Sequence, residues 1–182
     1  MKDVSKGKIA ILATDGFGQS ELILPLELLR SAGADVEVVS LKPGKIRGWN
    51  KDHWDKEIEV DKTLDEAAAD DYGLLVLPGG QINPGRLRIE ARAVDFVKAF
   101  ASLDKPIAAI CHGPWLLIEA GAVKGRKLTS YRSIRMDITN AGGKWVDEEV
   151  VVDGNLITSR KPEDIPAFIE RVCEAAGVSS CG

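Results

Sequence analysis

The sequence has few cysteines, no excess of positive charge and no long apolar run. Its 182 residues include only three cysteines. These show no CxxC spacing, so we expect no disulfide framework and any cysteine chemistry to use a free thiol. With 24 Lys and Arg against 28 Asp and Glu, the net charge is −4, and nucleic acid and anionic membranes are unfavourable partners. No apolar run approaches the roughly 20 residues of a spanning helix. Because the opening MKDVSKGKIAIL has no signal-type cleavage site, we expect a soluble, cytoplasmic protein.

Short apolar runs alternate along the chain with longer segments of helical spacing. The runs that we interpret as buried strands cover residues 8–13, 35–41, 73–78 and 106–110. Apolar side chains recur at helical spacing between them and again near the C-terminus, from Ile165 to Cys173. Repeated strand–helix–strand units predict an α/β doubly wound, mostly parallel sheet sandwiched by helices. Residues 143–159 differ, because two β-rich runs flank Asp153 and Gly154 and predict a late antiparallel hairpin.

Unusual residues follow three of the predicted strands, at the edge of the sheet where open α/β folds bind ligands. After the first strand, Gly16 and Gly18 begin a dinucleotide-like pattern, but Glu21 stands at the third glycine position. Its carboxylate would repel a pyrophosphate, which disfavours nucleotide binding. After the third strand, the adjacent Gly79 and Gly80 either turn their amides toward a ligand or form a plain tight turn.

The fourth predicted strand ends directly at a cysteine. Cys111 and His112 precede Pro114, which opens the next helix, and the arrangement is similar to the nucleophile elbow of hydrolases. The helix N-terminus and the imidazole both favour the thiolate form. The alternative role for a cysteine is that of a small core residue. We assign that role to Cys173 on its apolar helix stripe, and we place Cys181 in a frayed tail.

Several segments recur together in one known family. They are Glu21 four residues before Pro25, LPGG at 77–80, AICHGPWLLIEAG at 109–121, GRKLTSY at 125–131, NAGGKWVDEEVVVDGNLITSR at 140–160 and the PEDIPAF ending. With them, residues 8–177 resemble the PfpI family within the DJ-1 superfamily, and the chain reads as a single domain, 1–182. The resemblance implies a flavodoxin-like fold. Members are described as intracellular cysteine peptidases, glyoxalase-type enzymes acting on methylglyoxal, protein or nucleotide deglycases, and stress-protective proteins.

The resemblance also implies roles for individual residues. Cys111 corresponds to the family nucleophile, His112 to the histidine beside it, and Glu21 to a carboxyl that contacts the thiol. The amides of Gly79 and Gly80, with that of His112, correspond to the oxyanion pocket. A carboxyl near a thiolate is kept protonated by charge repulsion, so it can donate a hydrogen bond to sulfur. The alternative for Glu21 is an ordinary carboxylate in the first turn of a helix.

Two departures from related patterns restrict the expected chemistry. Related class I glutamine amidotransferases use a His-Pro-Glu sequence where this chain has Lys161, Pro162 and Glu163, and lysine cannot serve as the triad imidazole. Peptidase-like members place an acid a few positions after LPGG to orient the histidine, whereas this chain has Gly85 near that position. Without the third group a Cys–His pair is weaker, which disfavours proteolysis.

The second histidine lies outside these motifs. We interpret His53 as an exposed loop residue, flanked by Trp49 and Trp54 that cover the core edge or a subunit contact, and the alternative is a role in the site. Two histidines with a single nearby thiol do not supply four converging ligands, so we expect no metal. We expect no cofactor either.

The sequence thus predicts a cysteine-dependent, stress-protective enzyme that acts on reactive carbonyls. The Cys111 thiolate would add to an aldehyde such as methylglyoxal, His112 or Glu21 would move the proton, and water would release the acid. One alternative is a redox-sensing or chaperone-like protein that uses oxidation of Cys111. Another is a peptidase assembled across subunits, with a peptide substrate. The resemblance implies at least a homodimer, with the site near a subunit contact.

Overall fold

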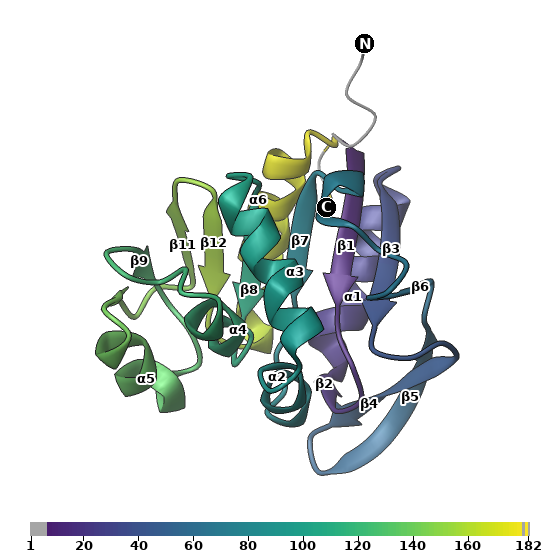
Figure 1. Cartoon of the computed structure of the whole chain (residues 1–182), viewed down its shortest axis with the longest axis horizontal. Helices are drawn as coiled ribbons and strands as arrows, with labels where there is room; N and C mark the ends of the chain where they lie inside the picture. The colour runs from purple at the N-terminus through teal and green to yellow at the C-terminus, as the bar shows by residue number, and fades with distance from the viewer. Residues whose placement is uncertain (1–6, 180, 182) are drawn as a thin grey trace.

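A seven-stranded sheet forms the centre of the protein (Figure 1). The computed structural model describes residues 7–179 and 181. In spatial order, the strands are β11 (Val150–Asp153), β12 (Leu156–Ser159), β8 (Ile107–Ile110), β7 (Leu74–Leu77), β1 (Lys8–Leu12), β3 (Asp35–Ser40) and β6 (Lys62–Thr63). β11 runs antiparallel to β12, and the other neighbouring pairs of this sheet are parallel. The predicted doubly wound fold is confirmed, and so is the late hairpin at Asp153 and Gly154.

The chain reverses its direction of winding across the sheet at β1. From β1 it moves first to β3 on one side and then returns to β7 on the other, continuing to β8 and β12. Two neighbouring strands whose connections lead to opposite sides leave a crevice beyond their carboxyl ends. The crevice between β1 and β7 is therefore the place where this fold can bind a ligand.

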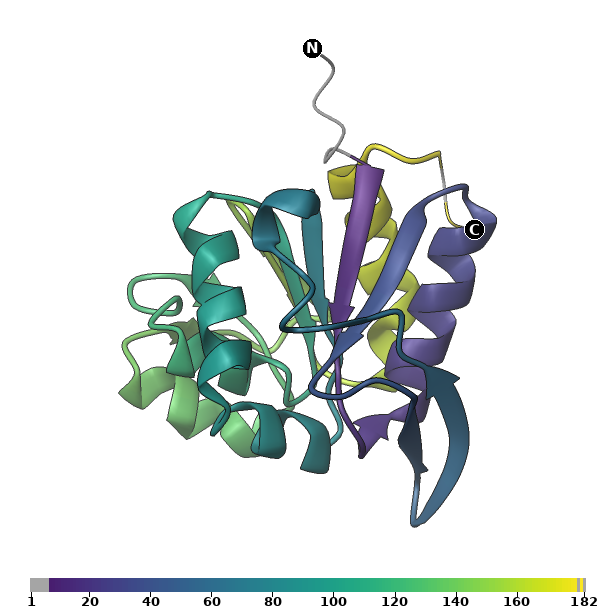
Figure 2. The same ribbon diagram turned by 45° about the vertical axis from the view of Figure 1, so that its right-hand side comes forward.

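Helices cover both faces of the sheet (Figure 2). One face packs α1 (Gln19–Ser31) and α6 (Ile165–Ala176), and the other packs α2 (Ile82–Leu87), α3 (Ala91–Ser102), α4 (Pro114–Glu119) and α5 (Arg135–Asn140). The sheet separates two apolar clusters, with Phe168 of α6 in one and Phe100 of α3 in the other. Among the described residues, no helix combines the length and apolar character needed to cross a membrane.

Two small sheets and three short 3-10 turns complete the described chain. The sheets pair β9 (Lys127–Leu128) with β10 (Lys144–Trp145), and β2 (Phe17–Gly18) with β4 (Lys45–Asn50) and β5 (His53–Glu59). The 3-10 turns cover Ala69–Asp71, Arg132–Ile134 and Pro162–Asp164.

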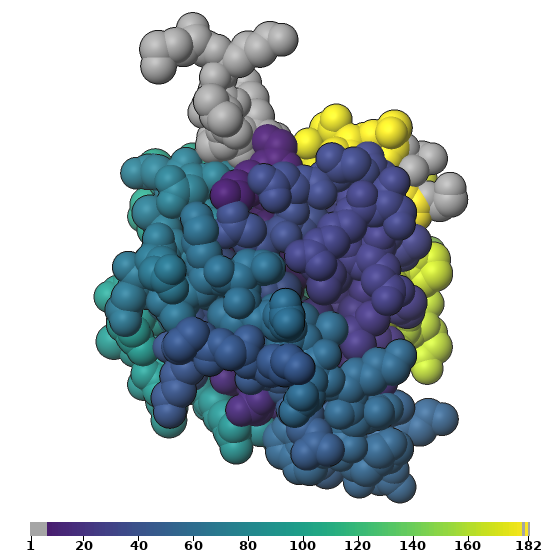
Figure 3. Space-filling view, turned by 90° about the vertical axis from the view of Figure 1, so that its right-hand side faces the viewer, coloured from purple at the N-terminus to yellow at the C-terminus, as the bar shows by residue number. Residues whose placement is uncertain are grey.

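The β4–β5 hairpin corrects the interpretation of His53 as a loop residue. Lys51 and Asp52 form the turn, and His53 is the first residue of β5. Trp49 and Trp54 are paired in register, with ring centroids 5.3 Å apart. The hairpin, in blue in Figure 3, lies at the surface: β5 is mostly exposed, whereas Ile46 and Gly48 of β4 are buried. Because β5 buries none of its residues, its sequence lacks the apolar alternation that identifies a half-buried strand, which explains the error.

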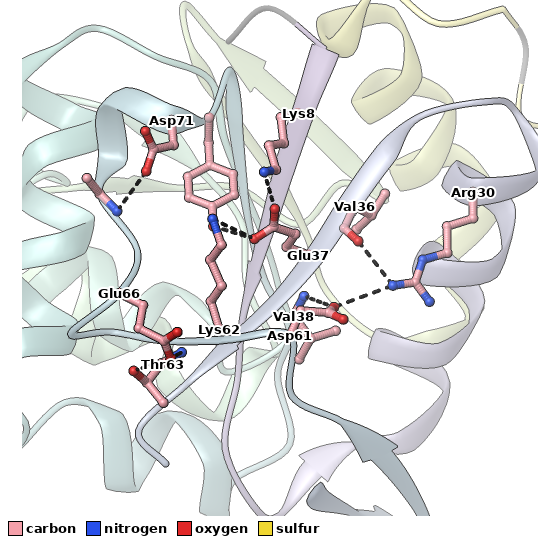
Figure 4. A network of polar contacts seen from close by, with 12 residues as sticks. Lys8, Arg30, Val36, Glu37, Val38, Asp61, Lys62, Thr63, Glu66 and Asp71 are labelled. Carbon is pink, nitrogen blue, oxygen red and sulfur yellow. Dashed lines mark hydrogen bonds and ion pairs between the residues drawn. The ribbon is translucent and has the colours of Figure 1, made fainter. Parts of the chain in front are cut away.

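Charged side chains hold β3 between its neighbours at the end of the sheet away from the crevice (Figure 4). Glu37 of β3 pairs with Lys8 of β1 and, at 3.5 Å, with Lys62 of β6, and it accepts a hydrogen bond of 2.9 Å from the Tyr72 hydroxyl. Asp61 accepts the Val38 amide at 2.7 Å. These contacts connect strands that are distant in sequence.

The C-terminal cysteines correct the expectation that the chain forms no disulfide. Cys173 is buried on the apolar face of α6, as predicted, but it forms a disulfide with Cys181. Helix α6 ends at Gly177, whose left-handed conformation (φ 69°) reverses the chain. The reversal brings the Cys181 backbone alongside Cys173, with 6.3 Å between Cα atoms. The same turn explains why Cys181 is not in a free tail.

Candidate active site

Cys111 lies in a strained turn at the carboxyl end of β8. Its φ of 61° is in the left-handed region, which costs a residue with a side chain about 1–3 kcal/mol. The Cys111 amide donates to Ser159 of β12 at 3.1 Å, and its carbonyl accepts the Tyr131 amide at 2.9 Å. Gly113 permits the turn, because a Cβ there would lie 2.4 Å from the Leu77 carbonyl oxygen. The elbow predicted from the sequence is present.

Glu21 reaches the same point from the first turn of α1. Its side chain is buried, and Oε1 accepts the Gly80 amide at 3.0 Å. Oε2 has no hydrogen-bond partner in the described structure, and the carboxyl lies close enough to the Cys111 thiol for each group to affect the pKa of the other. Burial raises the pKa of Glu21 to about 7, although the nearby Cys111 thiol and the hydrogen bond from the Gly80 amide oppose the shift. The site therefore contains a carboxyl that is substantially protonated at neutral pH.

The protonation states of the Cys111 thiol and the Glu21 carboxyl depend on each other. Burial raises the pKa of Cys111, and the negative charge of ionised Glu21 raises it further. Since burial disfavours both anions and each anion repels the other, the pair holds at least one proton near neutral pH. The resting site thus contains a thiol, and the expected depression of its pKa is not found.

His112 is a neutral proton acceptor beside this thiol. Burial lowers the pKa of His112, so the imidazole is uncharged at pH 7. Its Nδ1 lies 3.2 Å from Cys111 Sγ, and its Nε2 lies 3.2 Å from Ser133 Oγ. A neutral imidazole accepts through one nitrogen and donates through the other. With the thiol donating to Nδ1, the proton on Nε2 is donated to Ser133.

Two aromatic rings fix the plane of His112. Tyr131 stacks on it with centroids 5.2 Å apart, and Trp115 meets it edge-on at 5.0 Å. The sequence analysis did not identify Ser133, Tyr131 or Trp115 as site residues. Tyr131 and Trp115 lie within segments quoted for the family resemblance, but no spacing rule links a serine to a histidine 21 positions away.

The two glycines after β7 allow the carboxyl and the sulfur to approach the backbone. A Cβ at Gly79 would lie 2.6 Å from the Cys111 Cβ and 2.9 Å from Glu21 Oε1. The Gly80 amide is already bonded to Glu21. The structure brings Glu21, Gly79, Gly80, Cys111 and His112 together, while the catalytic roles of the side chains and the oxyanion role of the amides stay predictions.

Asn83 is a further buried residue that the sequence analysis missed. Its Oδ1 accepts the Thr14 amide at 2.8 Å, and its Nδ2 donates to the carbonyls of Pro78 and Gly79, both at 3.1 Å. The side chain therefore joins the loop after β1 to the loop after β7. A buried amide with these bonds holds the Gly79–Gly80 turn in place.

Gly85 lies close to the aromatic side of the site. A Cβ at this position would have the Trp115 ring as its nearest neighbour, at 4.0 Å. Within residues 7–179, His112 has no carboxylate hydrogen-bond partner, and Asp137 acts on it only through space. The Asp137 carboxylate instead accepts the Trp115 indole N–H at 2.9 Å.

The remaining candidates lie elsewhere. His53 is in the β4–β5 hairpin, where its Nδ1 lies 2.8 Å from the Asp52 carboxylate. The part of the chain that the structure describes contains no group of three His, Cys, Asp or Glu side chains placed to hold a metal. A cavity of about 340 Å³, lined by Tyr131 and Arg160 among others, adjoins the histidine side of the site.

Comparisons with known proteins find a family and several relatives. The profile of the DJ-1/PfpI family matches residues 7–175. The chain is 45% identical over 162 residues to "Deglycase TK1284" of Thermococcus kodakarensis, covering 89% of this chain and 95% of that protein. It is 43% identical over 162 residues to "Putative cysteine protease YraA" of Bacillus subtilis, covering 88% and 93%.

A solved structure shares the fold over nearly the whole chain. It is a two-domain protein from Anabaena variabilis with a DJ-1/ThiJ/PfpI-like and a ferritin-like domain. The TM-score is 0.88 at 36% identity, over 93% of this chain and 48% of that one. From the matched profile and these relatives, the chain belongs to the DJ-1/PfpI family.

Proposed function

We propose that the protein is a cofactor-independent, cysteine-dependent enzyme of the glyoxalase or deglycase type, acting on methylglyoxal or its adducts. The observation that carries the proposal is the position of Cys111, 3.2 Å from a neutral imidazole and on the same side of Gly79 as a buried carboxyl. The printed name of the Thermococcus relative, a deglycase, supports the same class of activity. The protonated carboxyl and the neutral base give the site an acid and a base at neutral pH.

The proposed reaction begins with sulfur adding to the aldehyde carbon. The Cys111 proton moves to His112 Nδ1 as the S–C bond forms, and the carbonyl oxygen is protonated to give a hemithioacetal. Removal of the remaining hydrogen from that carbon gives an enediol, and protonation at the neighbouring carbon gives a lactate thioester. Water then cleaves the thioester to lactate and the free thiol. One carbon is oxidised while its neighbour is reduced, so the reaction needs no external oxidant or metal.

Glu21 and His112 divide the proton transfers in this scheme. A group with a pKa of about 7 both donates and accepts a proton with little cost at neutral pH. Glu21 is suited to the transfers between carbon and oxygen, while His112 takes the thiol proton. The Gly79 and Gly80 amides would stabilise the oxyanion, the Gly80 amide once Glu21 releases it from their hydrogen bond.

Ser133 takes the place of the carboxylate that orients a catalytic histidine. By accepting the Nε2 proton, its hydroxyl leaves the Nδ1 lone pair facing the thiol. A hydroxyl fixes the tautomer but adds no negative charge to stabilise an imidazolium. This favours addition to an electrophilic dicarbonyl over hydrolysis of an amide, in which the imidazolium must protonate a poor leaving group.

A peptidase assembled across subunits is the second candidate. The printed name of the Bacillus relative, a putative cysteine protease, supports it. It would require an acid that Gly85 does not supply, and we propose that this activity is the weaker one. Redox sensing through Cys111 is less favoured, because a buried thiol of raised pKa reacts slowly with peroxides.

We also propose that the protein acts in the cytoplasm as a homodimer or a larger homo-oligomer. A reducing compartment keeps the Cys111 nucleophile free. The substrates proposed are small carbonyls or glycated groups, with no nucleic-acid scaffold or membrane.

The decisive experiment is to mix the purified protein with methylglyoxal and to measure lactate. We expect lactate from the wild type and none above background from Cys111→Ser. Cys173→Ser is the matched control, because it removes a cysteine at a distance from the site and should retain activity. Equal lactate formation by wild type and Cys111→Ser, with both folded by circular dichroism, would overturn the proposal.

A further inference from the structure

The Cys173–Cys181 pair is a second sulfur centre that the proposed reaction does not use. Cys173 is the ninth residue of α6, so it lies about 12 Å along the helix from its first residue, at a rise of about 1.5 Å per residue. Helix α6 starts just after β12, near the crevice, and runs away from it toward the opposite end of the sheet (Figure 1). The pair is therefore remote from Cys111.

Backbone geometry favours this disulfide independently of the sulfur positions. The Val178 amide donates to the Cys173 carbonyl at 3.2 Å across the left-handed Gly177, a helix-ending motif that turns the chain back along the helix. The resulting Cα separation of 6.3 Å lies within the range that disulfides adopt. The turn, rather than chance contact in a loose tail, brings the two cysteines together.

The two sulfurs differ in access. Cys173 is 2% exposed among the apolar side chains of α6, whereas Cys181 is partly exposed at the edge of a cavity of about 750 Å³ between α1 and α6. A small reagent can therefore reach Cys181 first, and Cys173 is the buried resolving partner.

The charged side chains near the Cys173–Cys181 pair determine which reagents approach it most readily. Three charged side chains line the cavity in the described chain, and all are acidic: Glu170 and Glu174 lie within one turn of Cys173 on α6, and Glu163 lies at the other end of the cavity, near Glu21. Of these three carboxylates only Glu174 is in an ion pair, with Arg171 at 2.9 Å, and Arg171 acts on Glu170 through space. An acidic wall attracts cationic reagents and repels anionic ones, most strongly at low ionic strength.

We propose that Cys173 and Cys181 form a reversible redox site that exchanges with small cationic or neutral disulfides and disfavours anionic ones. In the reduced protein, the Cys181 thiolate attacks the reagent disulfide and displaces one thiolate. The Cys173 thiolate then attacks Cys181 sulfur and displaces the second, so that two protein thiols become one disulfide and the reagent leaves as two thiols. The two thiol protons pass to the departing thiolates. Oxidation links Cys181 covalently to α6, and reduction removes that link.

The test uses the full chain carrying Cys111→Ser, so that Cys173 and Cys181 are the two cysteines whose alkylation is measured. The reduced protein is exposed to cystamine, hydroxyethyl disulfide or glutathione disulfide, quenched and unfolded in iodoacetamide, and the alkylated thiols are counted by mass. We expect two alkylated thiols before oxidation and none after it. The rate should be about tenfold higher with cystamine than with glutathione disulfide at low ionic strength, with the neutral reagent between.

Glu170→Gln should reduce this preference, and Asp95→Asn is the control that removes the same charge from α3 on the other face of the sheet. Both thiols remaining alkylatable after all three reagents, or disulfides forming only between chains, would overturn the redox site. Equal rates with the three reagents would overturn its charge selectivity. Because the protein lacks the Cys111 thiol, none of these outcomes depends on the carbonyl chemistry.

Discussion

Glu21 and Glu37 are two inward-facing carboxyls of this protein with opposite surroundings. Glu37 faces two lysines and a tyrosine hydroxyl. Although its partial burial acts in the other direction, these partners hold the pKa of Glu37 below its usual value. Glu21 lies deeper and faces a thiol and an amide, and burial raises its pKa to about 7.

The contrast separates a carboxyl that holds strands together from one suited to chemistry. An ionised, paired carboxylate stabilises the fold but has no proton to give at neutral pH. An unpaired, buried carboxyl destabilises the fold when it ionises, and it can exchange a proton at pH 7. A buried acid without a cation, next to a cysteine in a strained turn, is therefore the stronger indication of a site.

The largest expected effect is on activity. Glu21→Gln should lower kcat/KM for methylglyoxal by a factor of about 10²–10³, because the amide cannot exchange a proton. Glu37→Gln, the matched control at the paired carboxyl, should stay within about twofold of wild type. Initial rates of lactate formation by wild type, Glu21→Gln and Glu37→Gln measure these effects. Equal losses in both variants would mean that the two carboxyls do not differ in role.

The two carboxyls should also give opposite dependences of stability on pH. The pKa of Glu21 is higher in the folded protein than in the unfolded chain, so ionisation penalises folding as the pH rises from about 4.5 to 7. This penalty amounts to about 2–3 kcal/mol between pH 5 and pH 8. Glu21→Gln should remove that loss. Glu37 has the reverse sign, and its stabilisation is lost as the pH falls through its lowered folded pKa.

Urea unfolding of wild type, Glu21→Gln and Glu37→Gln at several pH values measures these slopes. The free energy of unfolding of Glu21→Gln, relative to that of the wild type, should increase toward pH 8. The free energy of unfolding of Glu37→Gln should fall furthest below that of the wild type at pH values where Glu37 of the wild type is ionised. Parallel curves for all three proteins would contradict the contrast.

A smaller effect is expected at Ser133. Ser133→Ala should lower kcat/KM about tenfold, because the imidazole loses its fixed tautomer and orientation. It should also shift the pH dependence of kcat/KM, which a purely structural role would not do. Ser133→Thr keeps a hydroxyl and should restore most of the activity. If Ala and Thr behave alike, the hydroxyl does not position His112.

The smallest effect is expected from introducing a carboxyl side chain at Gly85, on the side of the site where His112 lies. Gly85→Glu should raise cleavage of a fluorogenic peptide about 3- to 10-fold and change methylglyoxal turnover less, since only amide hydrolysis needs a stabilised imidazolium. The nearest atom to a Cβ there is 4.0 Å away, so the backbone accepts the side chain. Robust peptide cleavage by the wild type that is lost in Cys111→Ser would show that another group already completes the triad.

Much of the fold and the centre of the site followed from local patterns. The buried strands have continuous apolar sequences, the elbow has a strand that runs into Cys111 and Pro114, and the late hairpin has Asp153 and Gly154 at its turn. Each of these signals lies within a few residues. They are sufficient because the backbone preferences that they express are local.

Other features depend on contacts that no local pattern encodes. The raised pKa of Cys111 follows from burial, which opposes the lowering expected from its neighbours in sequence, and burial also sets the lowered pKa of His112. The bond from Ser133 to His112 arises only when two loops meet. The disulfide at Cys181 likewise depends on the turn at Gly177 rather than on the cysteine count.

The central claim, that Glu21 controls the proton of Cys111, is tested most directly by alkylation of Cys111 with iodoacetamide across pH 5–10, read by peptide mass mapping. In the wild type and in Glu37→Gln, the rate should show an inflection near pH 7, where Glu21 ionises. In Glu21→Gln that inflection should vanish and the apparent pKa of the thiol should fall, because the carboxylate charge that raises it is gone. A single profile shared by all three proteins would contradict the account.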